Sequence, residues 1–89
     1  MIVLFYADWC PACQMFKPEW QALEQDLAGE IPTESINTSN EKLVKSREHS
    51  YGIDIAAIPT IVILKDGKAE KYEGARNAKS IAKYARSIV

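Results

Sequence analysis

The feature that most constrains the fold is an apolar run, Ile2–Ala7, that ends shortly before the chain's two cysteines, Cys10 and Cys13. A short apolar run rich in β-branched and aromatic residues is typical of a strand covered on both faces. Pro11 follows the first cysteine directly and is well suited to the first turn of a helix. The pattern therefore predicts a buried strand whose chain turns into a helix at Cys10.

A helical stripe follows the cysteines. Apolar residues recur at intervals of four, three and four, at Phe16, Trp20, Leu23 and Leu27. Pro18 lies inside this stripe and is expected to kink the helix. Gly29 is placed to end it.

The remaining patterns predict three more strands and two more helices. In chain order they are a strand at 33–37, a helix capped by Thr38 and Glu41 that ends near Gly52, a strand at 60–64, a hairpin turn at 65–68, an edge strand at 69–73, and a helix from near Asn77 that buries Ile81, Tyr84, Ala85 and Ile88. Strands joined through a helix are parallel, and a hairpin adds antiparallel strands. The order β-α-β-α-β-β-α therefore predicts an α/β fold with a four-stranded mixed sheet and three helices.

Size and charge narrow the classes of protein to consider. With 89 residues, the chain is expected to form one domain, 1–89. A net charge of −1 and the absence of a long apolar run indicate neither a nucleic-acid nor a membrane partner. The N-terminus has no basic region or cleavage site typical of a signal peptide, so we expect a cytoplasmic monomer. In the cytosol a cysteine pair is more often catalytic than structural.

The position of the cysteines favours thiol chemistry. The first amides of a helix are unpaired and its dipole is positive there, which stabilises a thiolate at Cys10. A thiolate is the nucleophilic form of cysteine. Cys13 lies one helical turn later, close enough to attack a mixed disulfide formed on Cys10. A C-x-x-C pair beside a βαβ pattern therefore indicates a redox-active dithiol.

Two other interpretations of the pair are weaker. A structural zinc site takes four ligands, and the only imidazole, His49, has no partner at ligand spacing. A cluster shared between two chains through Cys10 stays open, because a dimer would supply four thiolates. A stabilising disulfide is a poor explanation, because closing so short a loop gains little. We expect neither a bound metal nor a cofactor.

Four motifs resemble the thioredoxin and protein disulfide isomerase superfamily, in the family's order and over nearly the whole chain. They are FYADWCPAC (Phe5–Cys13), KPEW (Lys17–Trp20), IPT (Ile58–Thr60) and YEGAR (Tyr72–Arg76). The resemblance implies a minimal, glutaredoxin-sized thioredoxin fold that starts at the strand leading to the cysteines. It also implies a thiol–disulfide oxidoreductase that transfers electrons without a bound cofactor.

The resemblance also implies a role for each matching residue. Cys10 would be the attacking cysteine and Cys13 the buried resolving one. Pro59 would follow a cis bond and pack against the pair, whereas from the residues alone it would simply begin a strand. Trp9 would flank the pair on the docking surface, and the backbone of Ile58 would pair with a substrate peptide like an added strand.

The late turn and the residues between the cysteines refine the resemblance. Arg76 resembles an arginine that in several disulfide isomerases lowers the pKa of the resolving cysteine, although an exposed arginine at a helix start is usually just solvated. The intervening Pro11–Ala12 matches neither the Gly–Pro of ordinary thioredoxins nor the Gly–His of most disulfide isomerases. It occurs in some membrane-tethered thioredoxin-related proteins of the secretory pathway. Because intervening residues tune thiolate stability, the direction of electron flow stays open.

Two departures from the family bear on mechanism. Leu4 stands where the family commonly has a buried carboxylate that relays a proton to the resolving cysteine, so the relay would use water, Asp8 or Arg76, or turnover would be slow. Asp8 follows the strand and is expected to be exposed. The segment YGIDIAAIPT, 51–60, implies a small insertion or a shift in register before Pro59.

The favoured prediction is an enzyme that exchanges disulfides with protein substrates and is itself reduced by a reductase or by glutathione. A glutaredoxin-like, glutathione-dependent enzyme working with Cys10 alone is the first alternative. A cluster- or metal-binding module and a redox-inert interaction domain are the alternatives outside enzyme chemistry.

Overall fold

Seven elements follow one another in the predicted order in the computed structural model, which describes residues 1–88. They are β1 (Ile2–Tyr6), α1 (Pro11–Asp26), β2 (Thr33–Asn37), α2 (Glu41–Tyr51), β3 (Thr60–Lys65), β4 (Lys68–Lys71) and α3 (Ala78–Ile88). The strands form one sheet in the order β2-β1-β3-β4. β1 pairs with β2 in parallel and with β3 antiparallel, and β3 pairs with β4 antiparallel. The predicted minimal thioredoxin fold, a four-stranded mixed sheet with three helices, is confirmed.

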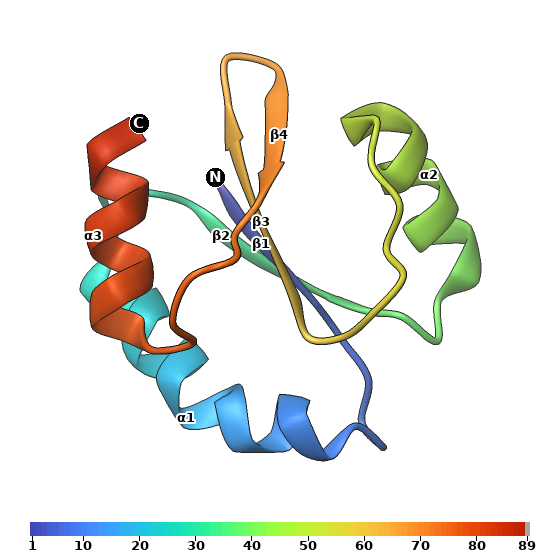
Figure 1. Ribbon diagram of the computed structural model, residues 1–89, viewed down its shortest axis with the longest axis horizontal. Coiled ribbons are helices and arrows are strands. Elements are labelled where there is room, and N and C mark those ends of the chain that lie inside the picture. The colour runs from blue at the N-terminus through green and yellow to red at the C-terminus, as the bar shows by residue number, and fades with distance from the viewer. Residues whose placement is uncertain (89) are drawn as a thin grey trace.

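β1 is central, and its alternating side chains separate two hydrophobic layers. Figure 1 shows α1 and α3 on one side of the sheet and α2 on the other. Ile2 and Leu4 pack toward α1 and α3, whereas Val3 and Phe5 belong to the cluster on the α2 side. Because successive side chains of a strand point to opposite faces, a strand covered on both faces is apolar throughout.

α1 begins and bends where the prolines predict. Pro11 occupies the first turn, and Cys10 is the N-cap with an extended backbone. The helix continues through Pro18, and Figure 1 shows its ribbon bending about half way along. The predicted stop at Gly29 comes slightly late, because the helix ends at Asp26 with Leu27 as its cap. Gly29, with φ of +77°, lies in the turn that follows.

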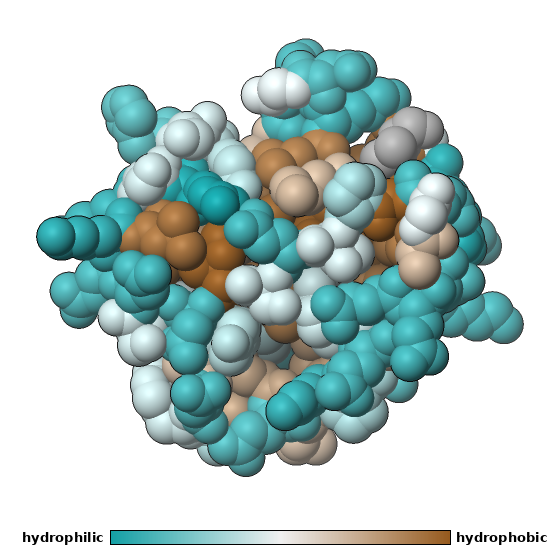
Figure 2. Space-filling model, turned by 180° about the vertical axis from the view of Figure 1, so that it is seen from behind, coloured by the Kyte–Doolittle hydropathy of each residue, from teal (hydrophilic) through white to brown (hydrophobic). Residues whose placement is uncertain are grey.

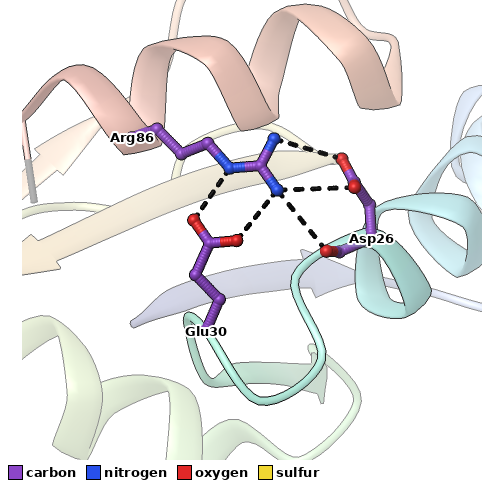
Figure 3. A network of polar contacts seen from close by, with 3 residues as sticks. All are labelled: Asp26, Glu30 and Arg86. Atoms are coloured by element: carbon purple, nitrogen blue, oxygen red, sulfur yellow. Dashed lines mark hydrogen bonds and ion pairs between the residues drawn. The ribbon is translucent and has the colours of Figure 1, made fainter.

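Two side-chain contacts hold α3 against α1. Glu19 Oε1 accepts a hydrogen bond from the N–H of Ala78, the first residue of α3, at 2.9 Å. Near the other end of α3, the Arg86 guanidinium reaches Glu30 at 2.8 and 2.9 Å and Asp26 at 3.4 Å (Figure 3). These contacts fix the position of α1, whose N-cap is Cys10 and whose first turn contains Cys13.

The predicted start of α2 is wrong. Asn40, not Thr38, caps the helix, and its Oδ1 accepts a hydrogen bond from the N–H of Leu43 at 3.3 Å. Thr38 lies two residues before this cap, and its N–H donates to Tyr6 O at 2.7 Å and extends the β1–β2 pairing. The predicted end holds, since Gly52 closes the helix in a left-handed conformation with φ of +69°.

The last two elements differ slightly from prediction. β4 ends at Lys71, before the predicted end at Glu73. In α3 the buried residues are Ile81, Ala82 and Ala85. Tyr84 and Ile88, predicted to be buried, are half-buried, and the Tyr84 hydroxyl donates to Glu70.

Hydrophilic side chains cover most of the face seen in Figure 2, with hydrophobic side chains visible in patches between them. The largest fully buried side chains include Phe5, Leu23 and Ile81, which lie in the two layers of the core. No helix within residues 1–88 combines the length and the apolar character needed to cross a membrane.

Candidate active site

The two cysteines meet where β1 ends and α1 begins. Cys10 is the N-cap of α1, and its Sγ accepts a hydrogen bond from the N–H of Cys13 at 3.1 Å. The Cys10 carbonyl accepts from the N–H of Gln14 at 3.0 Å, the first bond of the helix. A sulfur in this position accepts a hydrogen bond from an otherwise unpaired helix amide and lies at the positive end of the helix dipole. Both interactions stabilise a thiolate.

Both sulfurs are free thiols and both residues are buried. Cys10 is 4% exposed and Cys13 is 8% exposed. They cluster with Ala7, and the half-buried Tyr6, Ala12 and Ile58 pack against them. The resemblance implies burial for Cys13 in particular, but the two cysteines are almost equally buried. What distinguishes them is their position on the helix, because only Cys10 lies at its N-terminus.

The surroundings of Cys13 keep its sulfur protonated. Burial raises the pKa of the Cys13 thiol, and the hydrogen bond with Cys10 raises it further. A hydrogen bond from the Ala7 backbone and the charge of Arg76 lower it by smaller amounts, so the net shift is upward. A thiol that is protonated at neutral pH is suited to act second, after another sulfur has attacked.

The loop before β3 places Ile58 against the cysteines and continues into Pro59. The peptide bond between them is cis. The Ile58 carbonyl accepts a hydrogen bond from the Cys10 thiol with a sulfur–oxygen distance of 3.8 Å. Pro59 is buried directly before β3, whose first residue is Thr60. Ile58 therefore contacts the pair, and Pro59 follows it across the cis peptide bond.

An apolar surface surrounds the start of α1. Trp9 is 74% exposed, Pro11 is exposed and Ala12 is half-buried. Met15 is 81% exposed and follows Pro11 by one helical turn. The sequence reasoning missed Met15. The available signal was that this apolar residue lies off the buried helical stripe.

Arg76 lies beside the proline loop. It is exposed and lines a cavity of about 280 Å³ together with Pro59, Thr60 and Tyr72. The Tyr72 hydroxyl donates to Ala75 O at 2.8 Å and braces this turn. The guanidinium charge lowers the pKa of Cys13, the direction that the resemblance implies.

A second cavity, of about 460 Å³, is lined in part by Cys13. Leu4, 6% exposed, contributes an apolar wall to it, and Asp8 lines it from the loop after β1. Asp8 is exposed, as predicted. Within residues 1–88 no three His, Cys, Asp or Glu side chains come together as ligands for a metal ion.

Comparison with known protein families gives one match over almost the whole chain. The family model described as Thioredoxin matches residues 1–87. This sequence match agrees with the thioredoxin fold that the strand order shows.

Individual relatives carry names from the disulfide isomerase group. The chain is 33% identical to human "Protein disulfide-isomerase A4" over 99% of its own length and 13% of that protein. It is also 33% identical to human "Thioredoxin-related transmembrane protein 1" over 93% of its length and 28% of that protein. The chain thus spans only a small part of these relatives.

A solved structure agrees with these relatives. The solution structure of the first thioredoxin domain of mouse Protein disulfide-isomerase A4 is similar with a TM-score of 0.76 and 28% identity. The match covers 98% of this chain and 61% of that one.

Proposed function

The chain belongs to the thioredoxin family of thiol–disulfide oxidoreductases, and from that premise we propose that it exchanges disulfides with protein substrates through Cys10 and Cys13. The observation that carries the proposal is the hydrogen bond from the Cys13 N–H to Cys10 Sγ at 3.1 Å. It gives Cys10 the stabilised sulfur of a nucleophile and keeps the second sulfur one helical turn away.

The reaction proceeds in two exchanges. Cys10 as a thiolate attacks one sulfur of a substrate disulfide, forms a mixed disulfide and releases the other substrate sulfur as a thiolate. Cys13 then attacks Cys10, and the second substrate sulfur leaves. The substrate gains two electrons, and the protein keeps a Cys10–Cys13 disulfide. The same steps in reverse oxidise a substrate dithiol, and neither direction requires a bound cofactor.

Protein substrates dock beside Cys10 in this proposal. Trp9 presents a large exposed ring for apolar contact, which is the amphipathic kind of side chain common at recognition surfaces. The backbone of Ile58, next to the cis peptide bond, pairs with an extended substrate segment. Pro11 and Ala12 shape the helix start, and Pro59 holds Ile58 in place through the cis peptide bond.

The electron donor is a reductase or glutathione, and the cytosol remains the predicted compartment. The electron donor and the compartment both have to match the redox potential of the Cys10–Cys13 pair. For this two-electron couple, about 30 mV corresponds to 1.4 kcal/mol.

The test is an equilibrium titration of the pair against glutathione, with Cys13→Ser as the matched variant that lacks the intramolecular disulfide. We expect one two-electron transition in the unmodified chain and none in the variant. A potential at or below the cytosolic poise identifies a reductase, and a clearly higher potential identifies an oxidant or isomerase and removes the cytosolic prediction. Failure to form the disulfide at all would refute the proposal.

The same variant separates the proposal from the glutaredoxin-like alternative. Cys13→Ser is expected to lose turnover on protein disulfides while it accumulates mixed disulfides on Cys10. Full activity of Cys13→Ser with glutathione would instead support a mechanism with one cysteine.

A further inference from the structure

We propose that Asp8 accepts, through water in the cavity beside Leu4, the proton that Cys13 loses when it resolves the mixed disulfide. This inference rests on the proposed function. It assigns the role of proton acceptor to an exposed carboxylate outside the C-x-x-C motif. Four observations carry it: the state of the Cys13 sulfur, the shape of the cavity, the placement of Asp8 and the nature of the other lining groups.

Resolution creates a demand for a proton acceptor. Burial keeps Cys13 as a thiol, and only the thiolate attacks efficiently. The proton leaves Cys13 Sγ, and the sulfur's electron pair forms the bond to Cys10 Sγ. The bond between Cys10 and the substrate breaks, and the substrate sulfur leaves with that bond's electron pair and is protonated from solvent. Two protein thiols are oxidised while the substrate disulfide is reduced.

The cavity gives the Cys13 proton a path to solvent. Its volume is about 460 Å³, whereas one water needs only about 10–15 Å³ of such space. It extends from Cys13 along the face of α1 that carries Lys17 and Gln21, and it is closed by Leu4 and Ser35 of the sheet. A leucine neither accepts nor donates a proton, so the wall nearest the sheet centre does not take part.

Asp8 is a carboxylate that lines the same cavity as Cys13. It directly follows Ala7, which belongs to the buried cluster of the two cysteines. Two contacts fix it: its backbone carbonyl accepts from Gln14 Nε2 at 2.7 Å, and its Oδ2 accepts from Asn37 Nδ2 at 3.3 Å. Asp8 is therefore held between α1 and the end of β2, at the mouth of the cavity.

The other carboxylate that lines the cavity is too distant. Glu24 lies on α1 eleven residues after Cys13, which corresponds to about 16 Å along a helix that rises 1.5 Å per residue. The remaining titratable groups around Cys13 and the cavity are Tyr6 from β1, Cys10 and Lys17 from α1, and Arg76 from the turn before α3. Lys17 and Arg76 are cations, so they stabilise a thiolate without accepting its proton.

The experiment isolates the resolving step. Reduced protein is mixed rapidly with excess 5,5′-dithiobis(2-nitrobenzoate), and the released thiolate is followed by absorbance. The first release reports attack by Cys10 and depends on reagent concentration. The second reports attack by Cys13 on Cys10 and is first-order. Both phases are measured from about pH 6 to pH 10 for the unmodified chain, Asp8→Asn and the cavity-matched control Glu24→Gln.

We expect Asp8→Asn to slow the second phase about tenfold near pH 7, less than a fully positioned base would provide because water remains as an acceptor. The first phase should change less than about twofold. Toward pH 10 the difference should vanish, since hydroxide then removes the proton. Glu24→Gln should leave both phases within about twofold of the unmodified chain.

Three outcomes would overturn the inference: an unchanged second phase in Asp8→Asn, a slowing of equal size at every pH, or an equal effect of Glu24→Gln. The second of these would indicate that Asp8 acts only on structure. An absent first phase in the unmodified chain would instead refute the proposed function, so the two failures are distinguishable.

Discussion

Cys13 shows how a single charge outside the motif adjusts a sulfur. Arg76 lowers the pKa of Cys13 against the larger effect of burial. In a Cys10→Ser background, where Cys13 is the only thiol, Arg76→Gln should raise the pKa of Cys13, measured from thiolate absorbance near 240 nm against pH. The rise should be small, because solvent screens an exposed guanidinium.

Arg76→Lys is the matched control for this prediction. It keeps the positive charge and should leave the Cys13 pKa close to its original value. If Arg76→Gln and Arg76→Lys titrate alike, the charge of Arg76 does not act on the sulfur, and the implied role is lost.

At the level of residues, the sequence predicts which side chains carry the chemistry better than it predicts the burial and the cavity around them. Cys10, Pro11 and Pro59 are recognisable because a helix start and a proline before a strand are local patterns. The near-equal burial of the two cysteines is not local, since it depends on Ile58, 48 residues away from Cys10. The cavity beside Cys13 could not be predicted for the same reason, because its walls come from β1, β2 and α1.

At the level of elements, the start of α1 combines a cap with a nucleophile. Cys10 Sγ accepts the N–H of Cys13, as a serine hydroxyl does at an N-cap. Cys10→Ser should therefore be more stable than Cys10→Ala by about 1 kcal/mol, measured by urea unfolding under reducing conditions. The same pair of substitutions at Cys13 is the control. That side chain is buried inside the helix, so serine should give no advantage over alanine there.

An ion pair between β2 and α2 should make stability depend on pH. Arg47 contacts Glu34 with both terminal nitrogens and lowers the pKa of Glu34 below its ordinary 4.5. A lowered carboxyl pKa stabilises the fold above the unfolded-state pKa, and this contribution is lost as the pH falls through the folded-state pKa. Glu34→Gln should thus reduce the free energy of unfolding by about 0.5–1 kcal/mol at pH 7.

The difference in the free energy of unfolding between Glu34→Gln and the unmodified chain should shrink steadily below about pH 4. There the Glu34 carboxyl becomes protonated first in the unfolded and then in the folded chain. Urea unfolding at a series of pH values measures it, with Glu73→Gln as an exposed control outside this pair. A Glu34 effect that is constant down to pH 2.5 would contradict an electrostatic origin.

Sequence patterns predicted the elements well wherever the signal was local. β2 has the predicted bounds, and the glycine after α2 ends the helix as expected. The cap of α2 was misplaced because Thr38 and Asn40 are both good capping residues. Thr38 instead continues the strand pairing, since its N–H donates to the Tyr6 carbonyl, a contact across the sheet that a local pattern does not contain.

At the scale of the whole molecule, the two layers that cover the sheet are unequal. α1 buries Cys13, Phe16, Trp20 and Leu23, and α3 buries three residues, whereas α2 buries none. Undocking α2 therefore exposes less apolar surface than undocking either helix of the other layer, and it should cost less free energy. The link to the site is Ile58, which packs both with the α2-side cluster and with the cysteine cluster.

Native-state hydrogen exchange should consequently resolve two levels of protection. The most protected amides of α2 should open with a free energy at least about 1 kcal/mol below that of β1 and β3. α3 is the matched control, because it also has 11 residues but lies in the better buried layer, and it should exchange with the sheet. Equal opening free energies for α2 and α3 would mean that the thinner layer unfolds only with the whole molecule. A lower value for α2 would mean that the sheet cluster against which Ile58 packs loses its helical cover before the rest of the molecule unfolds.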